Sequence, residues 1–134
     1  MSSILLVDSS VWIDHYRRRL DPAKLRVLTQ AMQDNQAVLA PMVWLELVVG
    51  FRSPEEKTHL GNIRAAARWI ELPDDIWGRA AKNAGLLHAG GAVLRMSDLL
   101  VLTLADVMDF KLLHCDKDFE RPLKMKQFSR LRLE

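Results

Sequence analysis

Residues 4–10, Ile-Leu-Leu-Val-Asp-Ser-Ser, are the strongest indication of the fold class in this sequence. Four apolar residues in a row, ended by an acid and two serines, are typical of a short parallel strand that is buried on both faces. Apolar residues at helical spacing follow through Tyr16, and Ser9 or Ser10 could cap that helix. We therefore expect a strand that passes directly into a helix, with Asp8 at the strand's carboxyl end.

The rest of the chain repeats this alternation of short strands and helices. Strands are expected at residues 37–40 and 111–114, with a weaker one at 128–133 and a short extended link at 69–72. The other expected helices begin at Asp21-Pro22, run over 42–51, begin at Ser53-Pro54, run from Asp74 to about His88, and run over 97–107. The pattern predicts an α/β fold: a three-layer α/β/α sandwich with a short, mostly parallel sheet. By its length the chain is expected to form one domain, residues 1–134.

Composition excludes several classes of protein. With 49% hydrophobic and 27% charged residues, the chain can bury a core and is not a disordered tail. The one cysteine, Cys115, excludes an intrachain disulfide framework. The N-terminus resembles no signal peptide, and no apolar run reaches the ~20 residues that would span a bilayer. We therefore expect a cytoplasmic protein that does not bind membranes.

Four acids, far apart in the chain, each lie at or near an end of a strongly apolar segment: Asp8, Glu46, Asp98 and Asp116. Burying an unpaired carboxylate is costly, and no single Lys or Arg is placed to neutralise all four. If the fold brings them together, their repulsion raises their pKa values unless a cation lies among them. Oxygen ligands suit Mg²⁺ or Mn²⁺, so the sequence predicts a hard divalent metal at the carboxyl ends of the strands.

Each acid also has an ordinary structural interpretation. Asp8, Asp116 and Asp118 could be turn residues, and Asp98 could favour a helix N-terminus through the helix dipole. Glu46 is the hardest to explain in this way, because the helix over 42–51 is otherwise apolar on every side and is expected to be buried almost all round. It is the joint arrangement that favours a site. The histidines show no zinc-ligand spacing.

The charge is unevenly distributed along the chain. The net charge is only +2, but basic residues gather in two clusters: Arg17, Arg18 and Arg19, then Arg121, Lys124, Lys126, Arg130 and Arg132. An acidic pocket within a basic surface suits a polyanion that needs a metal at its scissile bond. A solvated face is the equally acceptable alternative for both clusters.

Four segments resemble the motifs of one known family, the PIN-domain ribonucleases, and within it the VapC toxins of bacterial toxin–antitoxin modules. Residues 5–13, Leu-Leu-Val-Asp-Ser-Ser-Val-Trp-Ile, are very similar to its opening strand and first acid. Residues 39–50 resemble the segment of its second acid, 97–105 that of its third, and 112–119 its closing acidic motif. Order, spacing and length all match. One departure is His114, where the family often has Thr, and residues 83–96 fit its variable region only loosely.

The resemblance implies a Mg²⁺- or Mn²⁺-dependent endoribonuclease that cleaves with water and leaves a 5′-phosphate and a 3′-hydroxyl. The resemblance implies that Asp8 and Asp98 are the principal metal ligands and that Glu46 and Asp116 complete or position the coordination shell through water. Asp118 and Ser10 would lie just outside the ligands. The basic residues Arg17, Arg18, Arg19, Lys124 and Lys126 are the candidates for contacts with RNA phosphates. The family further implies a homodimer and a cognate antitoxin protein.

Three other functions are compatible with acids at strand ends. A receiver-type phosphoacceptor domain needs adjacent acids after the first strand, and here that strand supplies only Asp8. A haloacid-dehalogenase-type phosphatase needs a second acid two residues after Asp8, where Ser10 stands. The third alternative is a degenerate domain of the same fold that binds RNA or protein without cutting it. The four acids argue against it, because a pure binder gains nothing from a repulsive cluster.

Overall fold

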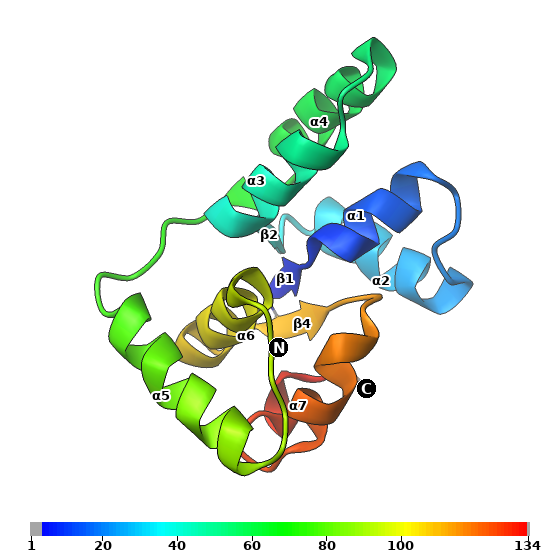
Figure 1. The fold of residues 1–134 in the computed structure, drawn as a ribbon. Coiled ribbons are helices and arrows are strands. Elements are labelled where there is room, and N and C mark those ends of the chain that lie inside the picture. Colours follow the sequence, from blue (N-terminus) through cyan, green and yellow to red (C-terminus); the bar gives the residue numbers. More distant parts are fainter. Residues whose placement is uncertain (1–3, 134) are drawn as a thin grey trace.

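The computed structural model describes residues 4–133 and places four short parallel strands in one sheet (Figure 1). The strands are β1 (Leu5–Val7), β2 (Ala37–Leu39), β3 (Arg68–Trp69) and β4 (Lys111–Leu113), in the order β3-β2-β1-β4. Leu5 pairs with Ala37 of β2 and with Lys111 of β4, so β1 is central. Every residue of β1 and β2 is buried, as the continuous apolar runs predict.

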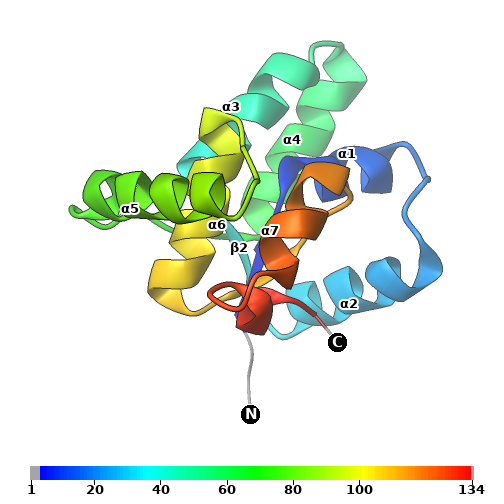
Figure 2. The same ribbon diagram turned by 60° about the horizontal axis from the view of Figure 1, so that its bottom comes forward.

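Helices lie on both sides of these strands. Figure 1 shows α5 and α6 on one side and α1 and α2 on the other, and the turned view in Figure 2 agrees. The helices are α1 (Ser9–Tyr16), α2 (Pro22–Gln33), α3 (Pro41–Gly50), α4 (Pro54–Ala66), α5 (Ile76–Ala89), α6 (Met96–Met108) and α7 (Glu120–Lys124), with 3₁₀ turns η1 (Lys117–Phe119) and η2 (Ser129–Leu131). The predicted α/β class with a parallel sheet and flanking helices is confirmed.

Two of the sequence-based strand assignments are corrected. The expected extended link contributes a true strand, because Arg68 and Trp69 pair with Val38 and Leu39 of β2. The strand expected at 128–133 is wrong, because that segment forms η2 and makes a single parallel bridge, Leu112 to Arg132. The chain therefore closes against the β4 edge with a turn and not with a fifth strand.

The helix starts follow local capping chemistry. Ser53 and Glu56 form the full capping box of α4, and Asp21 accepts a hydrogen bond from the backbone N–H of Lys24 at the start of α2. The first helix differs from expectation, because Asp8 is its N-cap and accepts from the backbone N–H of Ser10. Asp8 therefore both ends β1 and begins α1.

The helix α3 is not buried almost all round, contrary to the sequence-based expectation. Leu45 is 63% exposed and Val49 69% exposed, and Val48 is exposed as well. Figure 1 shows α3 and α4 extending together away from the strands, which leaves one face of α3 uncovered. Glu46 is consequently only half-buried, so its place in an apolar segment did not require a buried charge.

The core lies between the sheet and the helices. Its largest fully buried side chains include Trp12, Phe51, Phe119 and Phe128, from α1, the end of α3, η1 and the C-terminal segment. None of the helices within residues 4–133 combines the length and the apolar character that a membrane span requires.

Candidate metal centre

Asp8 is fixed at the junction of β1, α1 and the end of β4. Its backbone N–H donates to the carbonyl of Leu113 at 3.0 Å, which ties it to β4. Its Oδ2 accepts from the Ser10 hydroxyl at 2.6 Å and from the Ser10 backbone N–H at 3.2 Å. The Ser10 hydroxyl in turn accepts from the Cys115 backbone N–H at 3.0 Å. Ser10, expected just outside the ligands, therefore joins the ends of the two strands beneath Asp8.

Asp98 lies in the first turn of α6 and is as deeply buried as Asp8, since each is only 2% exposed. Among the residues that the structure describes, Asp8 Oδ1 and Asp98 Oδ2 are buried and have no hydrogen-bond partner. An unsatisfied buried carboxylate oxygen is costly, and a bound cation would satisfy it. In the described part of the chain, Asp98 Oδ2 has only the exposed guanidinium of Arg95 within ion-pair distance, at 3.6 Å, so a cation bound between the two aspartates would stabilise both oxygens.

Asp116 and Asp118 complete the acidic group from the turn after β4. One carboxylate oxygen from each of Asp98, Asp116 and Asp118 can lie within 4.8 Å of the others, a spacing that could hold a metal ion. Asp116 is half-buried and accepts from the backbone N–H of Asp118 at 2.9 Å, whereas Asp118 is exposed. Asp118, predicted to lie just outside the ligands, thus has this spacing with Asp98 and Asp116, whereas the predicted ligands Asp8 and Glu46 do not belong to this group of three.

The electrostatics agree with this crowding of carboxylates. Burial, and then the negative charges of Asp8, Asp116 and Asp118, raise the pKa of Asp98 from 3.8 to about 6, against the opposing effect of Arg95. Burial also raises the pKa of Asp8, although the hydrogen bonds from Ser10 oppose it. Deprotonated oxygens held close together at this cost are the donor set that a hard divalent cation prefers. The residues present therefore fit Mg²⁺ or Mn²⁺.

Glu46 connects the two buried aspartates through their serine neighbours. The Ser9 hydroxyl donates to Glu46 Oε1 at 3.2 Å, and the Ser97 hydroxyl donates to Oε2 at 3.1 Å. Each serine directly adjoins an aspartate of the cluster, Ser9 beside Asp8 and Ser97 beside Asp98. Glu46 thus holds the start of α1 to the start of α6, in an arrangement that orients ligands.

Arg95 is a charged neighbour of the cluster that sequence reasoning missed. Its guanidinium Nη2 lies 3.6 Å from Asp98 Oδ2 and 3.9 Å from Asp116 Oδ2, and its side chain is 74% exposed. Its contact with Asp98 could have been predicted from the spacing, because residues three apart at a helix start lie on the same face. The roles of Ser9 and Ser97 had no comparable signal, because serines at helix starts usually act as caps.

The basic residues named from the sequence separate into two kinds. Arg17, Arg18 and Arg19 are exposed between α1 and α2, and Lys124 and Lys126 are exposed near the end of the chain. Arg130, in contrast, is held by Asp106 at 2.6 Å and by Asp109 at 3.2 Å. The C-terminal basic cluster is therefore not one continuous surface for phosphates.

Comparison with known proteins accounts for this arrangement of acids. The PIN domain family matches residues 5–123. The chain is 30% identical over 124 residues to Ribonuclease VapC21 of Mycobacterium tuberculosis, in strains CDC 1551 / Oshkosh and ATCC 25618 / H37Rv, an alignment that covers 90% of this chain and 87% of the relative.

Solved structures share the fold over nearly the whole chain. VapBC2 from Rickettsia felis, solved with a DNA fragment of the promoter, matches with a TM-score of 0.77 at 16% identity over 97% of this chain and 96% of that one. VapBC-1 from nontypeable Haemophilus influenzae matches with a TM-score of 0.71 at 16% identity, over 90% and 93% of the two chains. With a family match over most of its length and a relative at 30% identity, the chain belongs to the PIN-domain family, with the VapC ribonucleases of toxin–antitoxin systems as its relatives.

Proposed function

We propose that this chain is a Mg²⁺- or Mn²⁺-dependent endoribonuclease and the toxin of a toxin–antitoxin pair. The observation that carries the proposal is the pair of buried carboxylate oxygens without hydrogen bonds, on Asp8 and Asp98, together with the close spacing of Asp98, Asp116 and Asp118. A protein that only bound RNA would gain nothing from a group that repels phosphates. The relationship to Ribonuclease VapC21 supports RNA as the substrate.

In this proposal each residue of the site has a separate task. Asp8 and Asp98 hold the metal, with Asp116 and Asp118 on the open side of the cluster. When bound, such an ion supplies Lewis-acid catalysis for hydrolysis of a phosphodiester bond. Ser10 orients Asp8 through its 2.6 Å hydrogen bond, and Glu46 fixes the spacing of the two helix starts through Ser9 and Ser97. Exposed basic residues, among them Arg17, Arg18 and Arg19, bind the phosphates of the strand.

The partner in this proposal is an antitoxin protein made alongside the toxin. Its support is that the solved structures with the same fold include toxin–antitoxin complexes, one of them from Klebsiella pneumoniae. The exposed apolar residues Leu45, Val48 and Val49 of α3, next to Glu46, offer a surface for a helical segment of such a partner. Homodimer formation and action in the cytoplasm, where RNA and antitoxin occur, belong to the same proposal.

The decisive experiment is cleavage of total bacterial RNA by the purified chain in Mg²⁺, in Mn²⁺ and in EDTA. We expect discrete fragments with 5′-phosphate ends in either metal and none in EDTA. Sequencing the fragment ends would name the RNA target. Asp8→Asn is the matched variant, because Asn caps helices as well as Asp does, so α1 should keep its start.

The degenerate binder makes the opposite prediction in the same experiment. Folded protein, free of antitoxin, that leaves RNA intact in both metals would contradict the nuclease and favour the binder. Fragments that persist unchanged in Asp8→Asn would indicate a contaminating nuclease and would likewise contradict the proposed site.

A further inference from the structure

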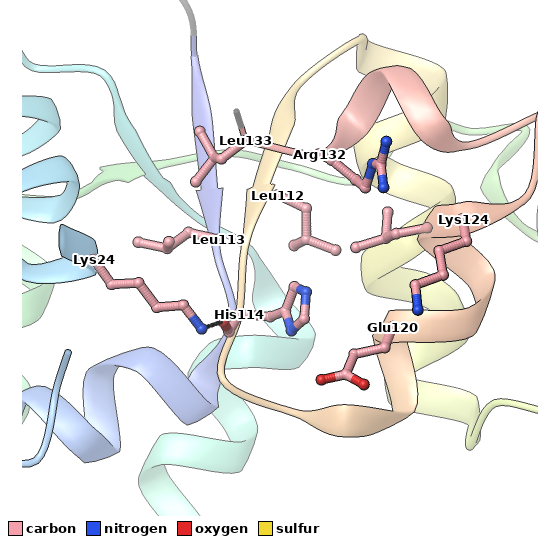
Figure 3. A pocket seen from close by; sticks show the side chains of 9 residues that line it. Lys24, Leu112, Leu113, His114, Glu120, Lys124, Arg132 and Leu133 are labelled. Atoms are coloured by element: carbon pink, nitrogen blue, oxygen red, sulfur yellow. Dashed lines mark hydrogen bonds between the residues drawn. The ribbon is translucent and has the colours of Figure 1, made fainter.

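A pocket of about 230 Å³ opens beside β4, apart from the carboxylate cluster (Figure 3). Leucines of β4, α7 and the C-terminal segment provide its apolar surface: Leu112, Leu113, Leu123 and Leu133. Lys24, Lys124 and Arg132 contribute three cationic groups, and Glu120 contributes the one acid among the lining residues. The lining is completed by His114, the residue at which the chain departs from the closing motif of its family.

Two of the three cations are available to a ligand. Lys24 Nζ donates to the His114 carbonyl at 2.7 Å, a bond drawn in Figure 3, and so helps to hold the chain at the end of β4. Within residues 4–133, the side chains of Lys124 and Arg132 have neither a hydrogen-bond partner nor an ion-pair partner. The pocket therefore presents unneutralised positive charge next to an apolar surface, which suits an anion with an apolar body.

Size and composition narrow the class of ligand. A volume of about 230 Å³ is smaller than the ~300–1,000 Å³ of pockets that take drug-sized molecules, so one ring-sized group fits. Proteins that bind single-stranded RNA combine cations for the backbone with aromatic and apolar side chains against which a base stacks. The His114 imidazole, which Figure 3 shows between the leucines and Glu120, adds an aromatic ring, and Glu120 adds an acceptor for the edge of a base.

The position of the pocket links it to the carboxylate cluster. His114 lies two residues before Asp116, a separation of at most ~7 Å along the chain. The neighbouring Leu113 lines the pocket and accepts the hydrogen bond from the backbone N–H of Asp8. The end of β4 therefore contributes to both places, because Leu113 holds Asp8 through its carbonyl and Leu113 and His114 line the pocket.

We propose that this pocket binds one nucleotide of the RNA strand that flanks the scissile bond, with its base against Leu133 and His114 and its phosphate at Lys124 and Arg132. Leu112, Leu113 and Leu123, each 2% exposed, form the apolar floor beneath the base. The inference rests on the proposed function for the identity of the polymer. It adds a site that reads one base, and it assigns His114 a role in place of the hydroxyl that the family often has there.

Binding of mononucleotides tests the pocket without any cleavage. Methyl and imidazole NMR spectra of the purified chain in EDTA would be recorded with each of the four 5′-mononucleotides, with inorganic phosphate, and with the uncharged nucleosides. We expect shifts at Leu112, Leu113, Leu123 and the His114 ring, with one nucleotide bound at least about threefold more tightly than the weakest. Phosphate alone and nucleosides alone should bind more weakly than the nucleotide.

Variants separate the pocket from general surface charge. Lys124→Ala should weaken the nucleotide about fivefold or more, whereas the control Lys82→Ala should leave its affinity unchanged, because Lys82 is exposed on α5 and does not line the pocket. His114→Thr should reduce the difference between the four bases and leave phosphate binding intact. On a single-stranded oligonucleotide, Lys124→Ala should also reduce the slope of log affinity against log salt by about 0.7.

Three results would overturn the inference. These are nucleotides that shift none of the pocket signals, inorganic phosphate that binds as tightly as the nucleotides, or a Lys124→Ala variant that binds no more weakly than Lys82→Ala. The proposed ribonuclease activity is measured with metal and RNA and this pocket with neither, so a failure of one proposal can be told from a failure of the other.

Discussion

The carboxylate cluster and the pocket both use residues at the end of β4, and they hold their polar groups in opposite ways. In the cluster, Asp8 and Asp98 are buried, and each has a carboxylate oxygen without a hydrogen bond; burial and then the neighbouring negative charges raise the pKa of Asp98 to about 6. In the pocket, Lys124 and Arg132 lie on the surface above a floor of leucines. The carboxylate cluster therefore holds negative charges that are partly shielded from water, whereas the cations of the pocket are exposed to water.

This difference indicates how strongly each site should depend on single residues. Burying a charge costs several kcal/mol unless a partner such as a metal ion compensates it. If these carboxylates hold a metal together, removing one of them should abolish the function of the cluster. Exposed cations each contribute little, so the pocket should lose affinity in small steps.

Asp98→Asn should abolish cleavage, with a fall in rate of about 10³-fold or more, because removing a metal ligand withdraws several kcal/mol of stabilisation from the transition state. The measurement is single-turnover cleavage of the RNA identified from total RNA, in Mg²⁺ and in Mn²⁺. Asp74→Asn is the control, since Asp74 is an exposed acid in the loop before α5. Equal rates for the two variants would show that Asp98 is not a metal ligand. They would also contradict the expectation that the cluster depends more strongly on single residues than the pocket does.

Ser97→Ala should have an intermediate effect, about tenfold on the rate, because it removes one of the two hydrogen bonds that hold Glu46. Glu46→Gln should cost about 10–100-fold if Glu46 positions the helix starts through Ser9 and Ser97. A loss as large as that of Asp98→Asn would instead identify Glu46 as a direct metal ligand. Metal titrations beside the rates would separate the two roles.

The metal-free protein should become less stable as pH rises from about 4 to 6. Because the folded-state pKa of Asp98 is raised above 3.8, the folded chain binds more protons than the unfolded chain in this window, and stability falls as pH increases. Asp98→Asn removes the part of this dependence that comes from Asp98, while the raised pKa of Asp8 keeps a smaller part. The variant should be about 1–2 kcal/mol more stable than the natural sequence at pH 7 in EDTA, but similar at pH 4. Urea denaturation at several pH values measures both. A natural chain with no loss of stability between pH 4 and 6 would show that the carboxylates are not electrostatically strained.

The positions of Asp8 and Asp116 at strand ends can be predicted from the sequence because their signal is local. An acid at the end of an apolar run, as at Asp8 and Asp116, marks the carboxyl end of a parallel strand, and all such ends meet at one edge of the sheet. The alternation of strands and helices likewise follows from apolar runs and caps, as at Ser53. These features need no knowledge of what packs against them.

What the sequence does not predict depends on packing between distant segments. Residues 128–133, Phe-Ser-Arg-Leu-Arg-Leu, alternate partly as a strand would, yet Phe128 and Leu131 are buried three residues apart in a 3₁₀ turn. The apolar composition of α3 cannot tell which face α1, α4 and α6 leave uncovered. The pocket joins α2, β4, α7 and the C-terminal segment. Lys124 and Lys126 are therefore equal candidates for phosphate contacts in the sequence, although only Lys124 lines the pocket.

Substitution of Arg95 should change the metal affinity of the cluster least. Arg95 combines the two kinds of group compared above, because it is an exposed cation in contact with the buried carboxylates. Its guanidinium lies within 4 Å of Asp98 and Asp116 and competes with an incoming cation for their charge. Water screens a side chain that is 74% exposed, so the competition should be modest.

We expect Arg95→Gln to bind Mn²⁺ about two- to fivefold more tightly, by isothermal titration at low salt, and the gain to shrink at high salt. Arg95→Lys keeps the charge and should bind like the natural chain. If Arg95→Gln and the natural chain bound Mn²⁺ equally at low salt, the contacts of Arg95 would carry no weight, and only the buried groups would set the affinity of the cluster for metal.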